Sequence, residues 1–426
     1  MEKKTRLVLI GNGMAGVRTL EELLKIAPDL YDITVFGTEP YGNYNRILLS
    51  PFLAGEKSLD EIMTNPRAWY EERGITLYTG DTVTRIDRRR RSVHSSSGRE
   101  VPYDRLLLAT GSEPFVIPVP GAELDGVITF RDIGDVNAML SAAQRGGKAV
   151  VIGGGLLGLE AAYGLHKRGM AVTVVHLLGS LMERQLDPVA AELLRHSLSQ
   201  RGLRFLMGKQ TRAVLGDTHV TGVRFKDADD SEIEADLVVM AAGIRPNMNL
   251  ARDAGLHCGK GVVVNDTMQT YDPRIYAVGE CVEHRQATYG LLAPLWEQAK
   301  VCASHLARMG YGRYPGSLSA TQLKVTGIDV YSAGDFTGDE DSEALIYKDI
   351  RRGVYKRVML KDNRITGAVL YGDTRDGGWY FRLMQSGENV SGAREHLIFG
   401  AAYADAARTA DDGRTKVPEE RLAASA

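Results

Sequence analysis

Residues Leu7–Gly16, which read LVLIGNGMAG, decide the fold of this chain. The run of four apolar residues predicts a short strand that is buried on both faces, as the strands of parallel sheets are. Gly11, Gly13 and Gly16 follow at once with the spacing G-x-G-x-x-G, and the leucines of Val17–Ile26 then recur at helical spacing. A second strand pattern, ITVF, comes next. The order strand, glycine turn, helix, strand predicts a dinucleotide-binding βαβ unit.

Each glycine of this turn has its own physical task. Gly11 allows the tight turn, Gly13 leaves room for a pyrophosphate to reach the backbone, and Gly16 lets the helix pack closely on the strand. The first helical residues, Met14 and Ala15, present their backbone amides and the positive end of the helix dipole to the phosphates. One such motif on its own is weak, because glycines also occur in tight turns that bind nothing.

The same arrangement recurs about 140 residues later in the chain. A strand is predicted at Ala149–Ile152, a helix at Leu159–Lys167 and another strand at Ala171–Val175, with a glycine turn between the first two. Two βαβ units at this separation predict two nucleotide-binding domains rather than one. The residues predicted to meet the second nucleotide are Gly153, Gly155, Leu156, Leu157 and Gly158.

The end of the strand after each helix is where a carboxylate would bind a ribose diol. In the first unit the nearest acid is Glu39, which is predicted to contact the ribose, with a solvated turn residue as the alternative. In the second unit the strand ends at His176 without an acid, so the sequence leaves NADH and NADPH open there. No arginine cluster follows to bind a 2′-phosphate, since Arg184 stands eight residues further on, and this favours NADH.

Composition and charge exclude several classes of protein. The 52 Lys and Arg residues nearly balance the 54 Asp and Glu residues, for a net charge of −2, which argues against nucleic-acid binding. The run Arg88–Arg91 is predicted to be a solvated hairpin turn. The three cysteines form no CxxC motif and the histidines show no ligand spacing, so no metal site is expected. The chain shows no pattern of a signal peptide or membrane span, and its few cysteines suit a reducing compartment, which predicts a cytoplasmic protein.

Two dinucleotide sites in one chain favour one tightly held cofactor and one that exchanges. Flavin with nicotinamide is the chemically sensible pair, because NAD(P)H gives up two electrons as a hydride and a flavin can pass them on singly. The sequence therefore predicts a flavin and a nicotinamide nucleotide as the two cofactors, with NADH favoured over NADPH at the second glycine turn.

The rest of the chain supports an α/β fold with two Rossmann-like dinucleotide-binding domains, for FAD and NAD(P), and a C-terminal α+β domain. From about Ser317 the pattern changes to successive short strands separated by Gly and Asp turns, which is typical of an antiparallel sheet. The predicted domains are residues 1–116 with 246–316 for FAD, 117–245 for NAD(P)H, 317–404 for the α+β domain and 405–426 for a flexible tail.

Five segments stand in the order found in flavoproteins with two dinucleotide-binding domains, namely Gly11–Gly16, Leu106–Pro114, Gly153–Glu160, Ala241–Asn247 and Tyr276–Glu280. Together they resemble the pyridine nucleotide–disulfide oxidoreductase superfamily over about residues 6–309. Within that superfamily, Tyr41–Ser50, Val174–Asp187 and Leu323–Phe336 look like the FAD/NADH module of assimilatory nitrite and nitrate reductases. The resemblance is strongest to the N-terminal region of the NADH-dependent nitrite reductase large subunit.

The resemblance implies roles for particular residues. Glu160 would lie where nicotinamide and flavin meet and Arg46 near the flavin, and these two are the expected catalytic residues. The residues expected to hold FAD are Gly11, Gly13, Met14, Ala15, Gly16, Glu39, Asn45, Arg46, Thr110, Gly111, Gly279, Glu280, Pro294 and Trp296. For Trp296, packing in the core is the alternative to a contact with FAD. The residues expected to hold the nicotinamide nucleotide are Gly153, Gly155, Leu156, Leu157, Gly158, Glu160, His176 and Gly243.

The chain also departs from that superfamily in ways that limit its chemistry. Its first cysteine is Cys258, so it lacks the CxxxxC pair of disulfide reductases. It also lacks the single Cys that peroxidase-type relatives carry in the segment matching Tyr41–Ser50. Many ferredoxin and rubredoxin reductases have Lys after the serine of that segment. Pro51 stands here instead, which excludes an ion pair from such a Lys to Glu160.

The sequence therefore predicts an FAD-dependent NAD(P)H dehydrogenase that passes electrons to a separate redox protein. By resemblance, that partner is a nitrate or nitrite reductase subunit with iron–sulfur, molybdenum or sirohaem centres, because this chain has too few cysteines for a [2Fe–2S] or sirohaem domain of its own. Two alternatives stay open, a ferredoxin or rubredoxin reductase of another pathway and a non-catalytic flavoprotein that senses NADH. Neither a membrane nor a nucleic acid is expected as a partner, and association into an oligomer stays open.

Overall fold

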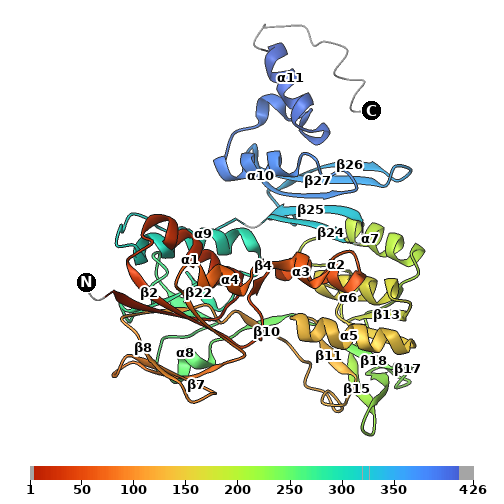
Figure 1. Cartoon of the computed structure of the whole chain (residues 1–426). Coiled ribbons are helices and arrows are strands. Elements are labelled where there is room, and N and C mark those ends of the chain that lie inside the picture. The colour runs from red at the N-terminus through yellow and green to blue at the C-terminus, as the bar shows by residue number, and fades with distance from the viewer. Residues whose placement is uncertain (1–3, 319, 326, 412–426) are drawn as a thin grey trace. The chain divides into compact units, whose positions relative to one another are not determined.

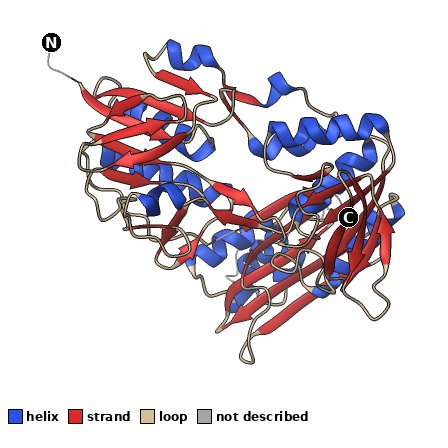
Figure 2. Cartoon of the chain, turned by 90° about the horizontal axis from the view of Figure 1, so that it is seen from below, coloured by secondary structure: helices blue, strands red, loops and turns tan. Residues whose placement is uncertain are grey.

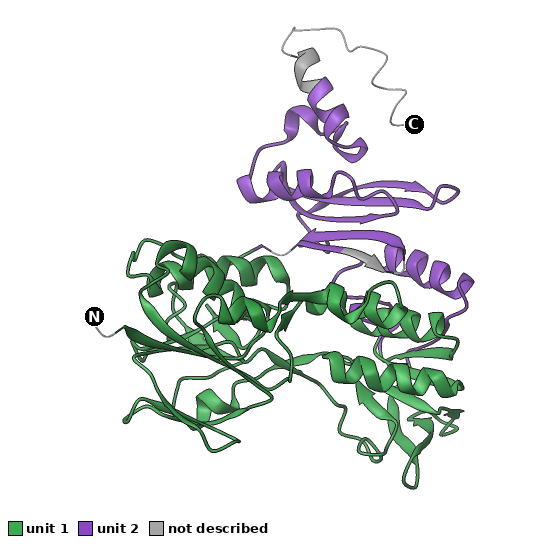
Figure 3. Ribbon diagram, in the orientation of Figure 1, with its two compact units in different colours: residues 1–153, 157–177, 209–317 green, residues 154–156, 178–208, 318–426 purple. Residues whose placement is uncertain are grey.

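The computed structural model describes residues 4–318, 320–325 and 327–411. Figure 1 labels many of the helices and strands and colours the chain from red at the N-terminus to blue at the C-terminus. They gather into two compact units (Figure 3). Unit 1 contains residues 1–153, 157–177 and 209–317. Unit 2 contains residues 154–156, 178–208 and 318–426.

The first sheet of unit 1 is parallel, with five strands in the order β21-β9-β1-β2-β5. Its strands are β1 (Thr5–Ile10), β2 (Tyr31–Gly37), β5 (Thr76–Thr79), β9 (Arg105–Leu108) and β21 (Ile275–Ala277). Leu7 and Leu9 of β1 are fully buried, because β1 pairs with β2 on one side and with β9 on the other. The buried strand predicted from LVLI is confirmed.

Helix α1 (Met14–Ile26) follows β1 after the glycine turn and shares its core. Val17, Leu20 and Leu23 are buried, three residues apart on one face, as expected of an amphipathic helix. The helix packs beside α9 (Leu292–Leu306), and the chain then returns to the sheet as β2. The predicted order of strand, turn, helix and strand is therefore confirmed.

The second sheet of unit 1 is built in the same parallel way. Within this unit its strands stand in the order β11-β18-β12-β13. They are β11 (Val127–Thr129), β12 (Lys148–Ile152), β13 (Ala171–His176) and β18 (Leu237–Met240), accompanied by helices α5 (Ile133–Arg145) and α6 (Leu156–Lys167). The second βαβ unit is confirmed, with its helix beginning at Leu156 rather than at Leu159 because the first turn of the helix starts inside the glycine motif.

Smaller sheets and short helices complete unit 1. Figure 2 shows the helices of the chain in blue and its strands in red. The strands β6 (Val83–Asp87), β7 (Ser92–Ser95) and β8 (Glu100–Pro102) form an antiparallel sheet, and its first hairpin turns at Arg88–Arg91, as predicted. Arg89–Arg91 are exposed, but Arg88 is half-buried and pairs with Asp272 at 3.0 Å, so the prediction of a solvated run is wrong for Arg88. The remaining elements are β3 (Asn43–Tyr44), β4 (Met63–Asn65), β10 (Ser112–Pro114), β15 (Thr211–Gly216), β16 (Val220–Phe225), β17 (Glu232–Glu234), β19 (Ile244–Pro246), β20 (Val262–Val264), β22 (Val282–His284), β23 (Ala287–Thr288), the 3-10 helix η1 (Arg46–Leu48), α2 (Leu49–Ala54), α3 (Leu59–Ile62), α4 (Arg67–Glu71) and α8 (Asn249–Asp253).

Unit 2 is built on an antiparallel sheet of five strands in the order β24-β25-β28-β27-β26. The strands are β24 (Ala320–Val325), β25 (Ile328–Gly334), β26 (Glu343–Asp349), β27 (Val354–Lys361) and β28 (Arg364–Tyr371). Helix α10 (Gly377–Ser386) packs on the sheet through Tyr380 and Leu383. This confirms the change to an antiparallel domain that the sequence predicts after Ser317.

Residues 178–208 belong to unit 2, where they form α7 (Pro188–Gln200) and β14 (Arg204–Met207). The hydroxyl of Tyr355 donates to the buried carboxylate of Asp187 at 2.8 Å, just before α7 begins. The predicted nicotinamide domain, residues 117–245, therefore contains residues of both units.

The last described elements are the 3-10 helices η2 (Ser391–Ala393) and η3 (Leu397–Phe399) and helix α11 (Ala401–Asp411). The tail predicted at residues 405–426 thus begins within a helix, and residues 412–426 lie outside the described residues. Across residues 4–318, 320–325 and 327–411, no helix combines the length and the apolar character that crossing a membrane requires.

Candidate functional site

Gly11 and Gly16 form the closely packed part of the first glycine turn. Gly11 has a φ of +105°, and a Cβ there would lie 2.1 Å from the carbonyl oxygen of Ala109. A Cβ at Gly16 would lie 2.8 Å from the carbonyl oxygen of Gly11 and 2.9 Å from the Cβ of Ala109. Both positions therefore require glycine, which agrees with the turn and packing roles inferred from the sequence.

Gly13 occupies the open part of the same turn. A Cβ there would meet no atom within 4 Å, and its φ of −86° is one that any residue can adopt. Gly13 is also the N-cap of α1, which has no side-chain cap and no acidic residue in its first turn. The backbone amides of Met14 and Ala15 at such a helix start suit anionic oxygens. The open glycine and the uncapped amides together fit the pyrophosphate of FAD.

The second glycine turn likewise has two closely packed glycines and one open glycine between them. Gly153 has a φ of +134°, and a Cβ there would lie 2.1 Å from the carbonyl oxygen of Ala241. A Cβ at Gly158 would lie 2.1 Å from the carbonyl oxygen of Gly153, whereas one at Gly155 would meet nothing within 4 Å. The first turn of α6, which begins with Leu156 and Leu157, carries no acidic residue. This turn also fits a dinucleotide pyrophosphate.

Glu39, the predicted ribose ligand, stands in a hydrogen-bond network at the end of β2. It accepts a hydrogen bond from the Tyr44 hydroxyl at 2.8 Å and pairs with the guanidinium of Arg46. Arg46 also donates to the backbone carbonyl of Arg131 at 2.9 Å. Asn45 caps η1 by accepting from the amide of Ile47 at 3.1 Å. The structure therefore brings Glu39 and Arg46 into contact and places Asn45 at the cap of η1.

Glu280 is held by a second set of polar contacts. Its carboxylate accepts a hydrogen bond from the Ser112 hydroxyl at 2.7 Å and pairs with the guanidinium of Arg131. Its neighbour Gly279 has a φ of +93° and donates its amide to the fully buried Gln298 side chain at 2.9 Å. Arg131 thus connects the two predicted parts of the FAD site, since its backbone binds Arg46 and its side chain binds Glu280.

The small-residue turn after β9 contains two further predicted residues. Thr110 donates its hydroxyl to the backbone carbonyl of Asn247 at 2.6 Å, and Gly111 accepts from the amide of Asn247 at 2.9 Å. Gly111 has a φ of +66°. Two hydrogen bonds to Asn247, which directly follows β19, therefore hold this turn in place.

The predicted residues of α9 lie in its first turns. Pro294 is buried and Trp296 is half-buried, with the guanidinium carbon of Arg18 at 5.6 Å from the centre of its ring. Arg18 belongs to α1, so this contact lies where α1 and α9 pack together. It supports the packing alternative for Trp296 and leaves its contact with a flavin as a prediction.

Glu160, an expected catalytic residue, projects from α6 and is half-buried. Its carboxylate accepts a hydrogen bond from the Ser50 hydroxyl at 2.5 Å. Burial raises the pKa of Glu160 to about 7, and the hydrogen bond from Ser50 partly opposes that rise. A carboxyl with such a pKa can hold a proton at neutral pH.

His176 and Gly243 are the remaining residues predicted to meet the nicotinamide nucleotide. His176 ends β13, is buried, and accepts the amide of Lys209 on its backbone carbonyl at 3.0 Å. Gly243 has a φ of +114° and open space beside it, and its carbonyl accepts the amide of Phe115 at 2.8 Å. Neither contact identifies a ligand, so their roles stay predictions.

Sequence reasoning missed three polar residues of these networks, namely Ser50, Ser112 and Arg131. Arg131 does carry a local signal, since it stands directly before the capping box that Asp132 and Asp135 form at the start of α5. Its partner Glu280, however, lies 149 positions further along the chain, and no local pattern predicts that contact.

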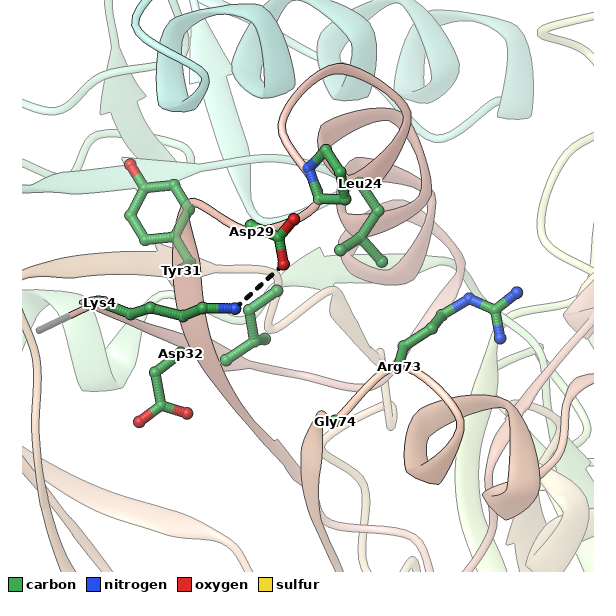
Figure 4. Close-up of a pocket in the computed structure, with 9 residues that line it drawn as sticks. Lys4, Leu24, Asp29, Tyr31, Asp32, Arg73 and Gly74 are labelled. Atoms are coloured by element: carbon green, nitrogen blue, oxygen red, sulfur yellow. Dashed lines mark hydrogen bonds and ion pairs between the residues drawn. The ribbon is translucent and has the colours of Figure 1, made fainter. Parts of the chain in front are cut away.

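A surface hollow of about 330 Å³ lies elsewhere in unit 1 (Figure 4). Lys4 and Asp29 form an ion pair of 3.3 Å across it. The residues that line it are Lys4, Leu24, Pro28, Asp29, Tyr31, Asp32, Ile33, Arg73 and Gly74. They include none of the predicted site residues, so the hollow is separate from the two glycine turns.

The cysteines are free thiols that burial keeps protonated. Cys281 and Cys302 are fully buried, and burial raises the pKa of both. Burial also raises the pKa of the half-buried Cys258. Thiols in such surroundings are poor nucleophiles. Among the described residues, no group of His, Cys, Asp and Glu is arranged to hold a metal ion.

The chain is similar to known proteins over most of its length. The chain matches the family model for pyridine nucleotide-disulphide oxidoreductases over residues 5–305 and the model for the rubredoxin NAD+ reductase C-terminal domain over residues 320–388. It is 52% identical over 388 residues to a nitrite reductase (NAD(P)H) of Bacillus subtilis (strain 168), covering 91% of this chain and 48% of that protein. It is 48% identical over 396 residues to the assimilatory nitrate reductase electron transfer subunit of the same organism, covering 93% and 51%. The chain thus spans about half the length of these curated relatives.

Solved structures agree with the family models. A NAD-dependent persulfide reductase from A. fulgidus has a TM-score of 0.85 at 25% identity, covering 96% of this chain and 84% of that one. An NADH:rubredoxin oxidoreductase from Clostridium acetobutylicum has a TM-score of 0.75 at 27% identity, covering 91% and 97%. The predicted fold, superfamily and class of enzyme, a flavoprotein oxidoreductase that uses NAD(P)H, are confirmed. The chain belongs to the pyridine nucleotide-disulphide oxidoreductase family.

Proposed function

We propose that this chain is the FAD-dependent NAD(P)H dehydrogenase of an assimilatory nitrate or nitrite reductase system, and that it passes electrons to a separate redox centre. One observation carries the proposal. The chain has two glycine turns, each with an open central glycine at a helix start without acidic residues. Two such turns provide for one resident and one exchanging dinucleotide.

The first turn is assigned to FAD. Met14 and Ala15 would direct their amides at its pyrophosphate, and Gly13 would leave space for it. Glu39 would bind the ribose, for which it must share its hydrogen bonds with Arg46. When bound, FAD supplies a ring that accepts a hydride and releases the two electrons one at a time.

The second turn is assigned to NADH, with NADPH as an alternative substrate. Gly155 would face the pyrophosphate, and the amides at the start of α6 would bind it. Glu160, one turn further along α6, would then lie beside the nicotinamide. With both nucleotides bound at these turns, the chain would align the two rings, so the transfer needs no catalytic triad.

The electrons would leave to a partner that carries iron–sulfur, molybdenum or sirohaem centres. The similarity to a nitrite reductase and to an electron transfer subunit of nitrate reductase supports this acceptor. We place the reaction in the cytoplasm, a reducing compartment where Cys258, Cys281 and Cys302 would remain free thiols.

An anaerobic titration with NADH tests the dehydrogenase. The purified yellow protein should lose its flavin absorbance rapidly as NADH is added, up to one equivalent per flavin. Bleaching that takes minutes or longer would favour a nucleotide sensor over a reductase. A protein that stays colourless after reconstitution with FAD would contradict the proposal altogether.

Co-purification of tagged protein from cells grown on nitrate tests the acceptor. The captured partner should contain iron together with molybdenum or sirohaem, and the pair should oxidise NADH only when nitrate or nitrite is supplied. Capture of a rubredoxin or ferredoxin, with NADH oxidation that does not depend on nitrate or nitrite, would instead indicate a ferredoxin or rubredoxin reductase of another pathway.

A further inference from the structure

The short helix α2 is fastened onto helix α6 by three kinds of contact. Leu53 packs so closely on Gly164 that a Cβ there would lie 2.6 Å from the Leu53 Cγ. Arg168 donates its Nε to the backbone carbonyl of Leu53 at 2.7 Å. Ser50 donates its hydroxyl to Glu160 at 2.5 Å. The hydroxyl of Ser50 is therefore held at the carboxyl of Glu160 by the packing of two helices.

Cations on the neighbouring segments are engaged elsewhere. Arg46, in η1, pairs with Glu39. Arg168 donates to the backbone at the end of α2, and Lys167 lies 3.9 Å from the carboxylate of Glu56.

Helix α5 also packs on α2, and it contributes no counter-charge either. Its acids Asp132 and Asp135 cap the start of α5 itself, and its Arg145 hydrogen-bonds to the backbone of its own helix. No charged group among the described residues acts on the Glu160 carboxyl, so burial decides its protonation and raises its pKa to about 7.

We infer that Ser50 is a positioning residue that orients the Glu160 carboxyl toward the reduced nicotinamide, and that burial without a cation, rather than Ser50, keeps this carboxyl neutral. This inference rests on the proposed function, which puts the nicotinamide at α6. The pair Ser50–Glu160 replaces the lysine–glutamate ion pair that Pro51 excludes.

A neutral carboxyl has different consequences from an ion-paired carboxylate. A partly buried carboxylate without a cation is costly, so the group takes up a proton from solvent instead. The neutral acid can donate a hydrogen bond to a carbonyl such as that of the nicotinamide carboxamide. Loss of the proton would place a negative charge beside the ring, which favours the positive ring of NAD+ over the neutral ring of NADH.

Infrared spectroscopy of the FAD-loaded protein tests the protonation directly. The C=O band of a protonated carboxyl should titrate away with a midpoint near the pKa of about 7, and Glu160→Gln should remove that band. Ser50→Ala should raise the midpoint by about one pH unit, because the lost hydrogen bond favours the ionised form. Ser50→Lys should lower the midpoint, and Ser50→Thr should restore the original value. A band from position 160 that is already absent at about pH 6 would overturn the inference, as would a midpoint that Ser50→Ala leaves unchanged.

Affinities for the two nicotinamide nucleotides test where the carboxyl points. The ratio of the dissociation constants of NAD+ and NADH should fall about tenfold between about pH 6 and pH 8 in the wild type, and stay constant in Glu160→Gln. A ratio without pH dependence in the wild type would overturn the contact with the nicotinamide. A failure of the proposed function can be told apart from a failure of this inference. If the proposed function is wrong, NADH does not bleach the flavin, but the infrared titration still measures the effect of Ser50 on the Glu160 carboxyl.

Discussion

Replacing Glu160 by Gln should change how the stability of unit 1 depends on pH. The ordinary pKa of a glutamate carboxyl is 4.5, and burial raises that of Glu160 to about 7. The difference, about 2.5 units at about 1.36 kcal/mol each, corresponds to about 3 kcal/mol. Between these pH values the folded chain keeps a proton that the unfolded chain has released, so the stabilising contribution is complete below pH 4.5 and is lost as pH rises through about 7. Gln does not titrate, and the wild type should therefore lose about 3 kcal/mol relative to Glu160→Gln over this range.

Urea unfolding at pH steps from about 4.5 to about 8 measures this difference, since the unfolding free energy is extrapolated separately at each pH. Glu123→Gln is the matched control, because it removes a carboxylate from an exposed position of the same unit. The stability curve of this control should run parallel to that of the wild type. Curves of wild type and Glu160→Gln that also run parallel would refute the reasoning from burial.

Further substitutions test the glycine turns, the Arg131 contact and unit 2. Gly13→Val should fold, because its Cβ meets no atom within 4 Å, yet lose FAD on gel filtration since the side chain fills the pyrophosphate position; a yellow protein would contradict the site. Gly155→Val should keep FAD and abolish bleaching by NADH. Bleaching at the wild-type rate would show that NADH does not bind at this turn. Arg131→Ala would leave the Glu280 carboxylate without its cation in the proposed FAD site, so FAD should dissociate about tenfold more readily, as released flavin fluorescence would report. Tyr355→Phe removes a hydrogen bond from the buried Asp187 and should cost about 2 kcal/mol in urea unfolding, whereas an unchanged midpoint would show that the contact is not stabilising.

The sequence by itself determined the features that depend on neighbours along the chain. The βαβ units were predictable because strand burial, helical spacing and glycine turns are local patterns, and Gly11 and Gly153 have the positive φ that such a turn needs. The antiparallel hairpins of unit 2 were predictable for the same reason, since their strands are separated by short turns. The pairing of β25 with β28 joins strands that are distant in sequence, and no local pattern predicts it.

Only the tertiary structure decided which side chains meet across long stretches of sequence. Ser50 and Glu160 are 110 positions apart, and Arg131 and Glu280 are 149 apart. No periodicity connects such residues, because their distance depends on how whole helices pack rather than on the preference of any single residue. The same packing withholds cations from Glu160 and buries its carboxyl, and burial, unlike residue type, decides whether that carboxyl carries a proton.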